Sequence, residues 1–398
     1  MDFKKVLTEE KLIKRVFYRA SCKLITAFRG YPCTKPAKKT DFYKDEDKYR
    51  EQILSTRKYG DISISLWPKG YDVACNIQFD DFCPKSNKQG EFDNGGIPGN
   101  GTALILEKLI KKFSFIKMTL FTIPESQFVK KALFNEKYGT EFLITNPVHS
   151  AWLSWIRSKE FVKTVEIASH GLHHYQSDVP FCWPAEEFAY KDEQECISAL
   201  KESKKIFAHA SLKPEGIRTA AYSLGKNKSV IDAIKKEKFL YMALSSPTAG
   251  LNARTKTVSN CYPTFVKNVL NLPENIAIKD LEAKNKIDYL IRMNGILAIK
   301  GHCILGTEWL ASGLDDKNIN NLYGIIDYLD KTYPKRVWFA KLEEIAKWWI
   351  ATSSLKVWRS NKSTYIKNCT KYEIKDLVVN INQKKKTVNI APNGTVTV

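Results

Sequence analysis

From about residue 70 to residue 353, short apolar runs alternate with amphipathic segments, and this alternation constrains the fold more than any other feature of the chain. The runs expected to be strands are 72–79, 115–123, 164–169, 216–223, 239–245, 295–304 and 337–340. The segments expected to be helices are 102–113, 149–161, 185–210, 228–237, 319–333 and 341–353. Such alternation is typical of parallel β–α units. At this length we expect an α/β fold, and a barrel in preference to an open sheet, which the same alternation also allows.

Different patterns flank this region on both sides. Residues 1–65 are expected to form a basic N-terminal extension, with an amphipathic helix over 9–28. Residues 66–354 are expected to form the barrel. Residues 355–398 carry short stretches of alternating apolar and polar residues, which are typical of antiparallel strands. We therefore expect a small β-rich module at the C-terminal end.

The chain is strongly basic, with a formal net charge of +20, and the excess is greatest near its two ends. Residues 1–40 carry eleven Lys and Arg against three carboxylates, and residues 356–398 carry nine against two. Basic surfaces suit anionic partners such as an acidic glycan, nucleic acid or an anionic membrane surface, which the helix over 9–28 could contact. The alternatives are that this helix packs on its own domain and that the lysines are solvated without a partner.

Cysteine usage and the N-terminal residues favour a cytoplasmic protein. The nine cysteines are odd in number, irregularly spaced and without a CxxC pair, as expected of reduced thiols. The first twenty residues lack the compact apolar stretch of a signal peptide, and no apolar run of about 18 residues could span a membrane. Peripheral contact with a membrane surface stays open, and the sequence predicts no oligomeric state.

Chemically capable side chains fall near the ends of several predicted strands. In a parallel barrel the carboxyl ends of the strands meet on one face, where active sites lie. The residues in question are Asp80 and Asp81 after the first strand, His170, His173 and His174 after the third, Arg218 within the fourth, and His302 near the end of the sixth. We expect them to converge at one mouth of the barrel.

This set of residues predicts a metal site. His170 and His174 are four positions apart, so on a helical turn they would lie on one face and could bind the same ion. A carboxylate from another strand would complete three ligands and leave a position open, as in catalytic sites for Zn²⁺ or for Fe, Co, Ni or Mn. The other Asp of the pair could then accept a proton from water. Taken singly, the adjacent acids could instead be loop residues and His302 a packed histidine.

Four motifs resemble those of the polysaccharide deacetylase family, also called carbohydrate esterase family four. They are "IQFDD", "SHGLHH", "GIRTAAYSLG" and "IKGHC", in this order, and the resemblance extends over about residues 70 to 350. It implies a distorted (β/α)7-type barrel and a divalent metal. It also implies removal of N-acetyl groups, or sometimes O-acetyl or other amide groups, from sugars.

The resemblance also implies roles for single residues. Asp80 would be the general base, and Asp81, His170 and His174 would hold the metal, with Zn²⁺ the ion expected. Arg218 would orient the base, and His302 would be the acid that protonates the leaving amine. His173 has no counterpart, so we expect it to be replaceable.

The sequence departs from the family pattern in two places. The family commonly has a proline two positions after the arginine, where this chain has Ala220, so Arg218 is expected to be less firmly placed. The family often has an aspartate on the following strand that tunes the acid histidine. The run 239–247 contains no carboxylate, so the pKa of His302 is expected to be set in another way.

Three functions of different kinds are compatible with these observations. The first is metal-dependent removal of N-acetyl groups from an amino-sugar glycan or glycan precursor. The second is another amide hydrolysis on the same fold, such as deformylation of a lipid-linked aminosugar. The third is non-catalytic polyanion binding with a structural metal. Nucleic acid is not expected as a partner, and the sequence does not name the sugar.

Overall fold

The computed structural model describes residues 45–84, 99, 101–126, 129–131, 136–138, 142–174, 187–189, 191–246, 251, 258–303, 313–361 and 363–398. For the strands β6 (Val129–Lys131) and β7 (Glu136–Tyr138), only the backbone is described. The basic helix expected over 9–28 lies outside the described residues. Among those described, no helix is long and apolar enough to cross a membrane.

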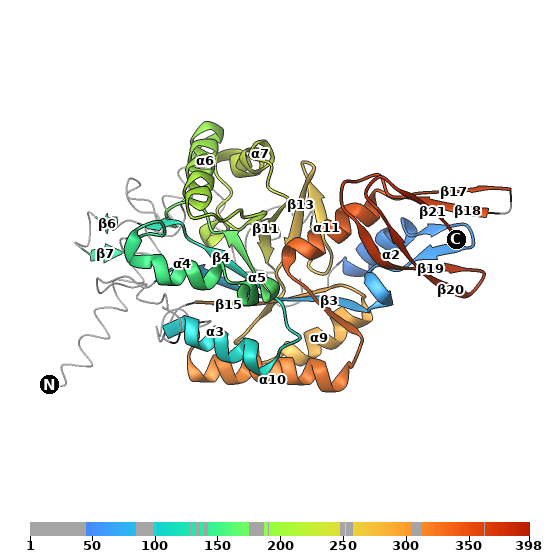
Figure 1. Ribbon diagram of the computed structural model, residues 1–398, viewed down its shortest axis with the longest axis horizontal. Coiled ribbons are helices and arrows are strands. Elements are labelled where there is room, and N and C mark those ends of the chain that lie inside the picture. The colour runs from blue at the N-terminus through green and yellow to red at the C-terminus, as the bar shows by residue number, and fades with distance from the viewer. Residues whose placement is uncertain are drawn as a thin grey trace.

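The centre of the molecule is a curled sheet of parallel strands, the distorted barrel that the sequence predicts (Figure 1). Its strands are β3 (Val73–Phe82), β4 (Met118–Thr122), β9 (Val165–Ser169), β10 (Gly216–Ile217), β11 (Tyr241–Ser246) and β15 (Ile296–His302). Neighbours pair in the order β11-β10-β9-β4-β3-β15. β4 and β15 are largely apolar, as expected of parallel strands that are covered on both faces, whereas β3 and β9 also carry buried polar side chains, among them Asn76, Gln78 and Glu166.

The ring is completed by a segment that the apolar pattern did not predict. The strand β13 (Val269–Pro273) pairs with β11, and β14 (Ile276–Ala277), three residues later, pairs with β15 on the other side. Buried polar side chains interrupt the apolar pattern here, because they take part in the pairing themselves. Asn271 accepts a hydrogen bond from the Leu244 amide at 3.1 Å, and Asn275 accepts one from the Ala298 amide at 2.9 Å.

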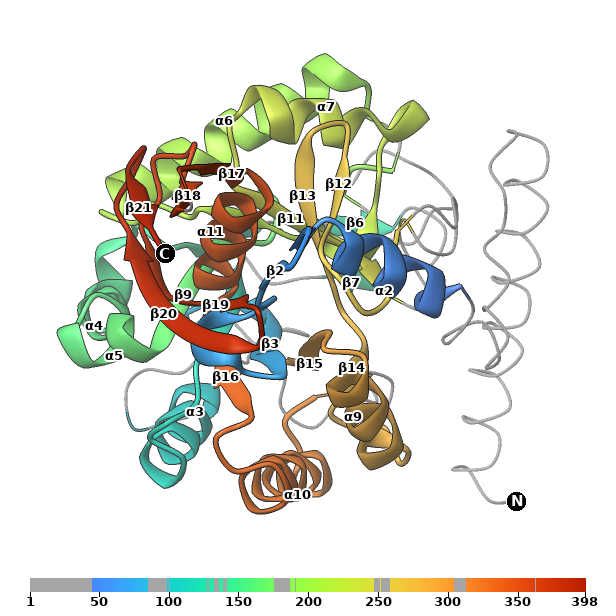
Figure 2. The ribbon, with the colours of Figure 1, turned by 90° about the vertical axis from the view of Figure 1, so that its right-hand side faces the viewer.

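Helices surround the barrel, as Figure 2 shows. They are α3 (Gly101–Lys112), α4 (Ser150–Ile156), α5 (Lys159–Thr164), α6 (Glu193–His209), α7 (Ser229–Lys236), α9 (Ala283–Arg292) and α10 (Asp316–Thr332). An eighth, α11 (Leu342–Ser353), begins inside the N-terminal end of the barrel. There Glu166 of β9 accepts a hydrogen bond from the Glu343 amide at 3.0 Å, and Thr119 of β4 accepts one from the Leu342 amide at 3.1 Å.

Several predicted boundaries were wrong. The helix expected over 185–210 begins only at Glu193, because Asp192 forms a capping box with Glu195. The strand expected over 216–223 ends at Ile217 and is followed by a single 3₁₀ turn, η4 (Ala220–Tyr222). The helix expected over 149–161 divides at Ser158, whose hydroxyl caps α5.

The remaining elements lie around the barrel and at one end of it. The strand expected over 337–340 is β16 (Val337–Phe339), which pairs only with the first residues of β3. The others are α2 (Glu46–Ser55), β5 (Glu125–Ser126), β8 (Phe142–Leu143), β12 (Thr264–Val266), and the 3₁₀ turns η2 (Pro68–Gly70), η3 (Pro147–His149) and η5 (Lys226–Lys228). Of these, β12 pairs antiparallel with β13, and β5 pairs antiparallel with β8.

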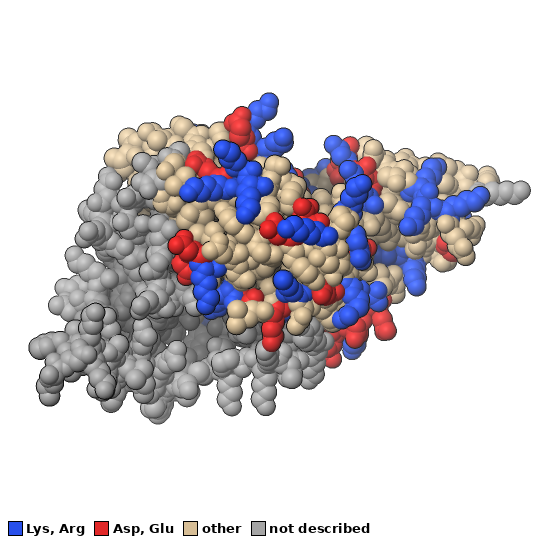
Figure 3. All heavy atoms as spheres, turned by 90° about the horizontal axis from the view of Figure 1, so that it is seen from below, with Lys and Arg blue, Asp and Glu red and all other residues tan. Residues whose placement is uncertain are grey.

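The last forty residues form antiparallel strands. One sheet contains β17 (Lys356–Ser360), β18 (Ser363–Lys367) and β21 (Thr395–Thr397), and another contains β19 (Ile374–Ile381) and β20 (Lys384–Ile390). The second sheet also includes β1 (Lys58–Tyr59) and β2 (Ile62–Ile64), so residues before the barrel pair with residues after it. Lys and Arg side chains lie along this end of the molecule (Figure 3). The division into three domains at residues 65 and 354 stays a prediction.

Candidate active site

An irregularity in β3 places two consecutive carboxylates at the mouth of the barrel. Successive side chains of a regular strand point to opposite faces, so Asp80 and Asp81 could not both face inward without one. Between Phe79 and Phe82 the pairing with β4 shifts by one residue, and Asp81 takes a left-handed conformation with φ of 61°. This is a β-bulge, a device that redirects a side chain. Both carboxylates are buried.

The turn after β9 brings His170 and His174 to the same place, but not by the helical spacing that the sequence predicted. Residues 170–174 form an irregular turn, with φ of 88° at Gly171 and 66° at His174. Glu187 holds this turn, because its Oε2 accepts hydrogen bonds from the amides of Leu172 at 3.0 Å and His174 at 3.2 Å. A Cβ at position 171 would lie 2.4 Å from that same oxygen, so only glycine fits.

Asp81, His170 and His174 form a buried group whose donor atoms all lie within 4.8 Å of one another. The Oδ1 atom of Asp81 is 3.3 Å from Nε2 of His170 and 2.9 Å from Nε2 of His174. Zinc-type ions sit about 2.0–2.2 Å from such ligands, which places the ligands of one ion roughly 3–3.5 Å apart. The spacing therefore fits one divalent ion.

The hydrogen bonding of His170 agrees with a cation site. Its Nδ1 lies 2.9 Å from the carbonyl oxygen of Arg218, an acceptor, so Nδ1 carries the proton of the neutral ring and Nε2 is left with a lone pair. That lone pair faces Oδ1 of Asp81, a buried oxygen 3.3 Å away. Two lone pairs facing each other repel unless a cation lies between them. The three residues together thus have the chemistry of a metal site.

Arg218 fixes one oxygen of the neighbouring carboxylate. Its Nη1 donates to Oδ1 of Asp80 at 2.7 Å, its Nε donates to the carbonyl of Ala243 at 3.1 Å, and its Nη2 donates to Gln78. The guanidinium is fully buried and packs on the ring of Phe121, 4.2 Å from the centroid. Arg218 is therefore firmly held although the family's proline is absent after it, contrary to what that departure led us to expect.

His302 lies across the mouth from the histidine turn. It ends β15, directly beside Asp80 in the register of the two strands, and its Nε2 lies 4.0 Å from Oδ2 of Asp80. Burial and the positive charge of Lys300 lower the pKa of His302 to about 4, and the nearby carboxylates offset this only in part. The imidazole is therefore neutral at neutral pH.

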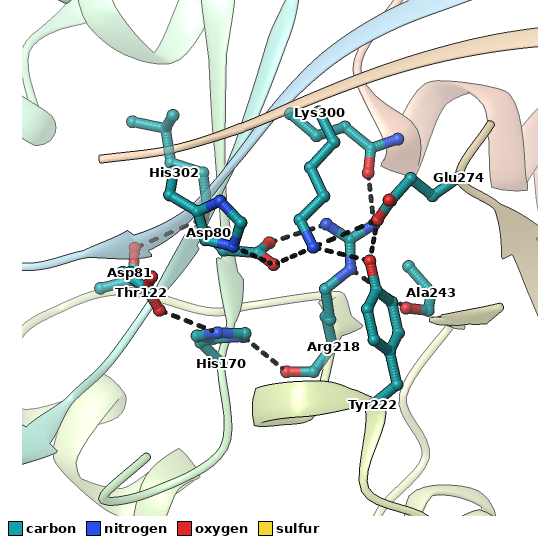
Figure 4. Close-up of polar contacts among 12 residues, drawn as sticks. Asp80, Asp81, Thr122, His170, Arg218, Tyr222, Ala243, Glu274, Lys300 and His302 are labelled. Carbon is teal, nitrogen blue, oxygen red and sulfur yellow. Dashed lines mark hydrogen bonds and ion pairs between the residues drawn. The ribbon is translucent and has the colours of Figure 1, made fainter. Parts of the chain in front are cut away.

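Sequence reasoning missed two residues of this site, Lys300 and Glu274, which lie together with Tyr222. Figure 4 shows them beside Asp80, on the side away from Asp81. The Nζ atom of Lys300 is 3.0 Å from Oδ2 of Asp80 and 3.4 Å from Oε2 of Glu274. The spacing could have revealed Lys300, since it is two positions before His302 on one strand and so shares its face. Glu274 lies in the strand segment that was not predicted.

These charges hold Asp80 in its ionised form. Burial alone would raise the pKa of Asp80, but Arg218 and Lys300 outweigh it and hold that pKa well below its usual range. Asp80 is accordingly an anion that contacts two cations, Arg218 at Oδ1 and Lys300 at Oδ2.

All of the residues expected to act at the site lie at the same end of the barrel. These residues are Asp80, Asp81, His170, His174, Arg218 and His302. His173 lies at the rim, where its Nδ1 is 3.5 Å from Oε2 of Glu125 and both side chains are partly exposed. It is not part of the Asp81, His170 and His174 group.

No family model and no curated protein sequence matches the chain. Solved structures do. A candidate polysaccharide deacetylase from Mycobacterium smegmatis covers 73% of this chain and 94% of its own, at 13% identity and a TM-score of 0.48. The peptidoglycan deacetylase PdaC from Bacillus subtilis covers 70% of this chain and 92% of its own, at 12% identity and a TM-score of 0.34. A pseudoenzyme of carbohydrate esterase family four from Bacillus anthracis covers 70% of this chain and 66% of its own, at 10% identity and a TM-score of 0.35. All three structures lie below 25% identity and below a TM-score of 0.5.

Proposed function

We propose that the protein is a metal-dependent hydrolase that removes N-acetyl groups from an amino-sugar glycan or glycan precursor. The observation that carries this proposal is the arrangement at the barrel mouth. A three-ligand donor group made of Asp81, His170 and His174 lies next to an ionised carboxylate, Asp80, and across from a neutral imidazole, His302. Three protein ligands with an open position are typical of catalytic sites rather than structural ones.

The metal would supply Lewis acidity, polarising the acyl carbonyl and lowering the pKa of water. The remaining steps belong to the side chains of the chain. Asp80 accepts the proton of the attacking water, and Arg218 keeps its carboxylate in place. The C–N bond then breaks, and the leaving nitrogen needs a proton to depart as an amine. His302 is the group placed to carry that proton from Asp80, since its neutral ring can accept a proton before it donates one.

The assay is release of acid from purified protein loaded with Zn²⁺, with Co²⁺, Ni²⁺, Fe²⁺ and Mn²⁺ as alternatives. Acetate is measured on N-acetylated amino-sugar oligomers, nucleotide-linked and lipid-linked amino sugars, and formate on their N-formyl counterparts. Acetate release supports N-deacetylation, and release of formate alone supports the second amide hydrolysis. Absence of both acids with metal bound, together with salt-sensitive polyanion binding, would leave the non-catalytic alternative.

The proposed substrate and location can be tested on the full chain. The basic N-terminal segment and the basic C-terminal module would favour an anionic or membrane-linked precursor met at the cytoplasmic surface of a membrane. Co-sedimentation with vesicles containing anionic lipid, but not with neutral vesicles, is the expected result. Equal binding to both kinds of vesicle, or to neither, would refute the membrane contact without touching the chemistry.

A further inference from the structure

The mechanism above leaves one part of the site unused, a buried cluster made of Lys300, Tyr222 and Glu274. The Nζ of Lys300 donates to the hydroxyl of Tyr222 at 2.6 Å and lies 3.0 Å from Asp80 and 3.4 Å from Glu274. An ammonium group has three hydrogens. Each of them has an oxygen within reach here, so the position of the ammonium group is set from three sides.

Tyr222 is brought into this cluster by an unusual backbone. Ala221 and Tyr222 have φ of 50° and 55°, a left-handed conformation that residues with a Cβ disfavour and that clusters at functional sites. The result is that the Tyr222 hydroxyl lies between Lys300 and Glu274 and donates to the latter. The ring also lies beside the Lys300 ammonium, 4.6 Å from centroid to nitrogen. A strained turn is thus retained where its side chain orders a lysine.

The two oxygens of Asp80 are held from different elements. Arg218, which follows β10, donates to Oδ1, whereas Lys300, on β15, contacts Oδ2, the oxygen that faces His302. A carboxylate held at one oxygen can still rotate about its side-chain bonds. Held at both, it has one orientation, with one oxygen directed at His302.

We propose that Lys300, held in place by Tyr222 and Glu274, is a positioning residue for Asp80 that fixes the proton-accepting oxygen opposite His302. The inference rests on the proposed hydrolase function and deepens it. The alternative is that Lys300 only balances the charge of buried carboxylates. The two differ in what happens when the charge is balanced in another way.

The decisive variant is therefore the double substitution Lys300→Met with Glu274→Gln, which removes one charge of each sign and keeps the cluster balanced. We expect it to bind metal stoichiometrically and to lose about 100-fold in kcat with KM nearly unchanged, as misplaced catalytic groups do. The control is Lys286→Met. Lys286 is a partly buried lysine on the outer helix α9 that pairs with Asp280, and its loss should leave kcat at the wild-type value. A metal-loaded double variant with wild-type kcat would overturn the proposal.

Two further measurements separate positioning from folding. In Lys300→Ala, propylammonium should restore activity at least tenfold, whereas propanol, which has a similar shape and no charge, should not. Tyr222→Phe should lower kcat in the wild type but by less than twofold in the double variant, because Tyr222 acts through Lys300. Equal rescue by both additives, or full additivity of Tyr222→Phe, would contradict the proposed role.

Crystal structures distinguish a failure of this inference from a failure of the proposed function. If the wild type releases no acid from any substrate, the hydrolase proposal fails. The orientation of Asp80 in the double variant then still decides the positioning role. A carboxylate turned away from His302 supports it, and an unchanged carboxylate refutes it.

Discussion

Replacing Glu166 with Gln should stabilise the protein at neutral pH and leave its stability nearly unchanged at pH 4. Glu166 is buried inside the N-terminal end of the barrel, where it accepts hydrogen bonds from Thr119 at 2.9 Å, Tyr241 at 2.8 Å and the amide of Glu343 at 3.0 Å. Gln can keep two of these bonds and reverse the third. Its oxygen accepts from Thr119 and from the amide, and its NH₂ group donates to the oxygen of Tyr241.

The magnitude follows from the pKa of this carboxyl. Burial, and then repulsion by Glu343, raise the pKa of Glu166 from 4.5 to about 7, although its three hydrogen bonds act the other way. Below pH 4.5 the group is protonated in the folded and the unfolded chain, so it costs nothing. As pH rises from 4.5 to about 7, this carboxyl loses its proton in the unfolded chain but keeps it in the folded chain. The unfolded chain is therefore stabilised relative to the folded one. Above pH 7 the difference is about 3 kcal/mol, since each pH unit is worth about 1.4 kcal/mol.

The measurement is denaturant unfolding of both proteins at pH 4, 5, 6, 7 and 8, followed by tryptophan fluorescence. The free energy of unfolding of Glu166→Gln minus that of the wild type should rise from near zero at pH 4 to about 3 kcal/mol at pH 8. Taking this difference cancels the titration of all other groups. A difference that is constant with pH would show that Glu166 keeps one protonation state throughout and would refute the reasoning.

Three other predictions concern the site and its supports. Asp81→Asn should no longer bind metal stoichiometrically, as measured by atomic absorption, whereas His173→Asn, its control at the rim, should still do so. Metal retained by the Asp81 variant would make the ligand assignment wrong. Gly171→Ala should weaken metal binding and lower the free energy of unfolding by about 1–3 kcal/mol, because the new Cβ meets Glu187 and φ is 88°; wild-type metal affinity would refute this. Asp192→Ala should cost about 1 kcal/mol by loss of the helix cap and leave metal binding intact, and denaturant unfolding with a metal titration would check both.

The apolar strands and the order of the polar residues after them could be predicted from the sequence, because both depend on local pattern. β3 and β9 are mainly apolar segments interrupted by single polar residues, so Asp80 near the end of the first and His170 after the second could be placed at the barrel mouth. The devices that complete the site were not predictable in this way. The bulge at Asp81 and the irregular turn at His174 depend on left-handed conformations, which a pattern of apolar residues does not encode.

The missed strand shows the second kind of failure. Asn271 in β13 and Asn275, between β13 and β14, are buried, and their side chains accept hydrogen bonds from the neighbouring strands, so the segment is less apolar than a barrel strand is expected to be. Because this segment was not predicted to be a strand, Glu274 was not identified as a site residue. Without Glu274, the burial of Lys300 could not be explained. A buried lysine two residues before a predicted catalytic histidine has no explanation until a carboxylate is found opposite it.

The balance of charge at the barrel mouth shows why the donor group is suited to a cation. Two cations, Arg218 and Lys300, lie within reach of two carboxylates, Asp80 and Glu274. This set is neutral in itself, which makes its burial tolerable. Asp81 stands outside it, with only imidazole nitrogens of His170 and His174 near its Oδ1. Because Lys300 and Arg218 are engaged by the neighbouring carboxylates, neither is left to neutralise Asp81. One carboxylate and two imidazoles, buried together, form a donor set that could hold a divalent cation.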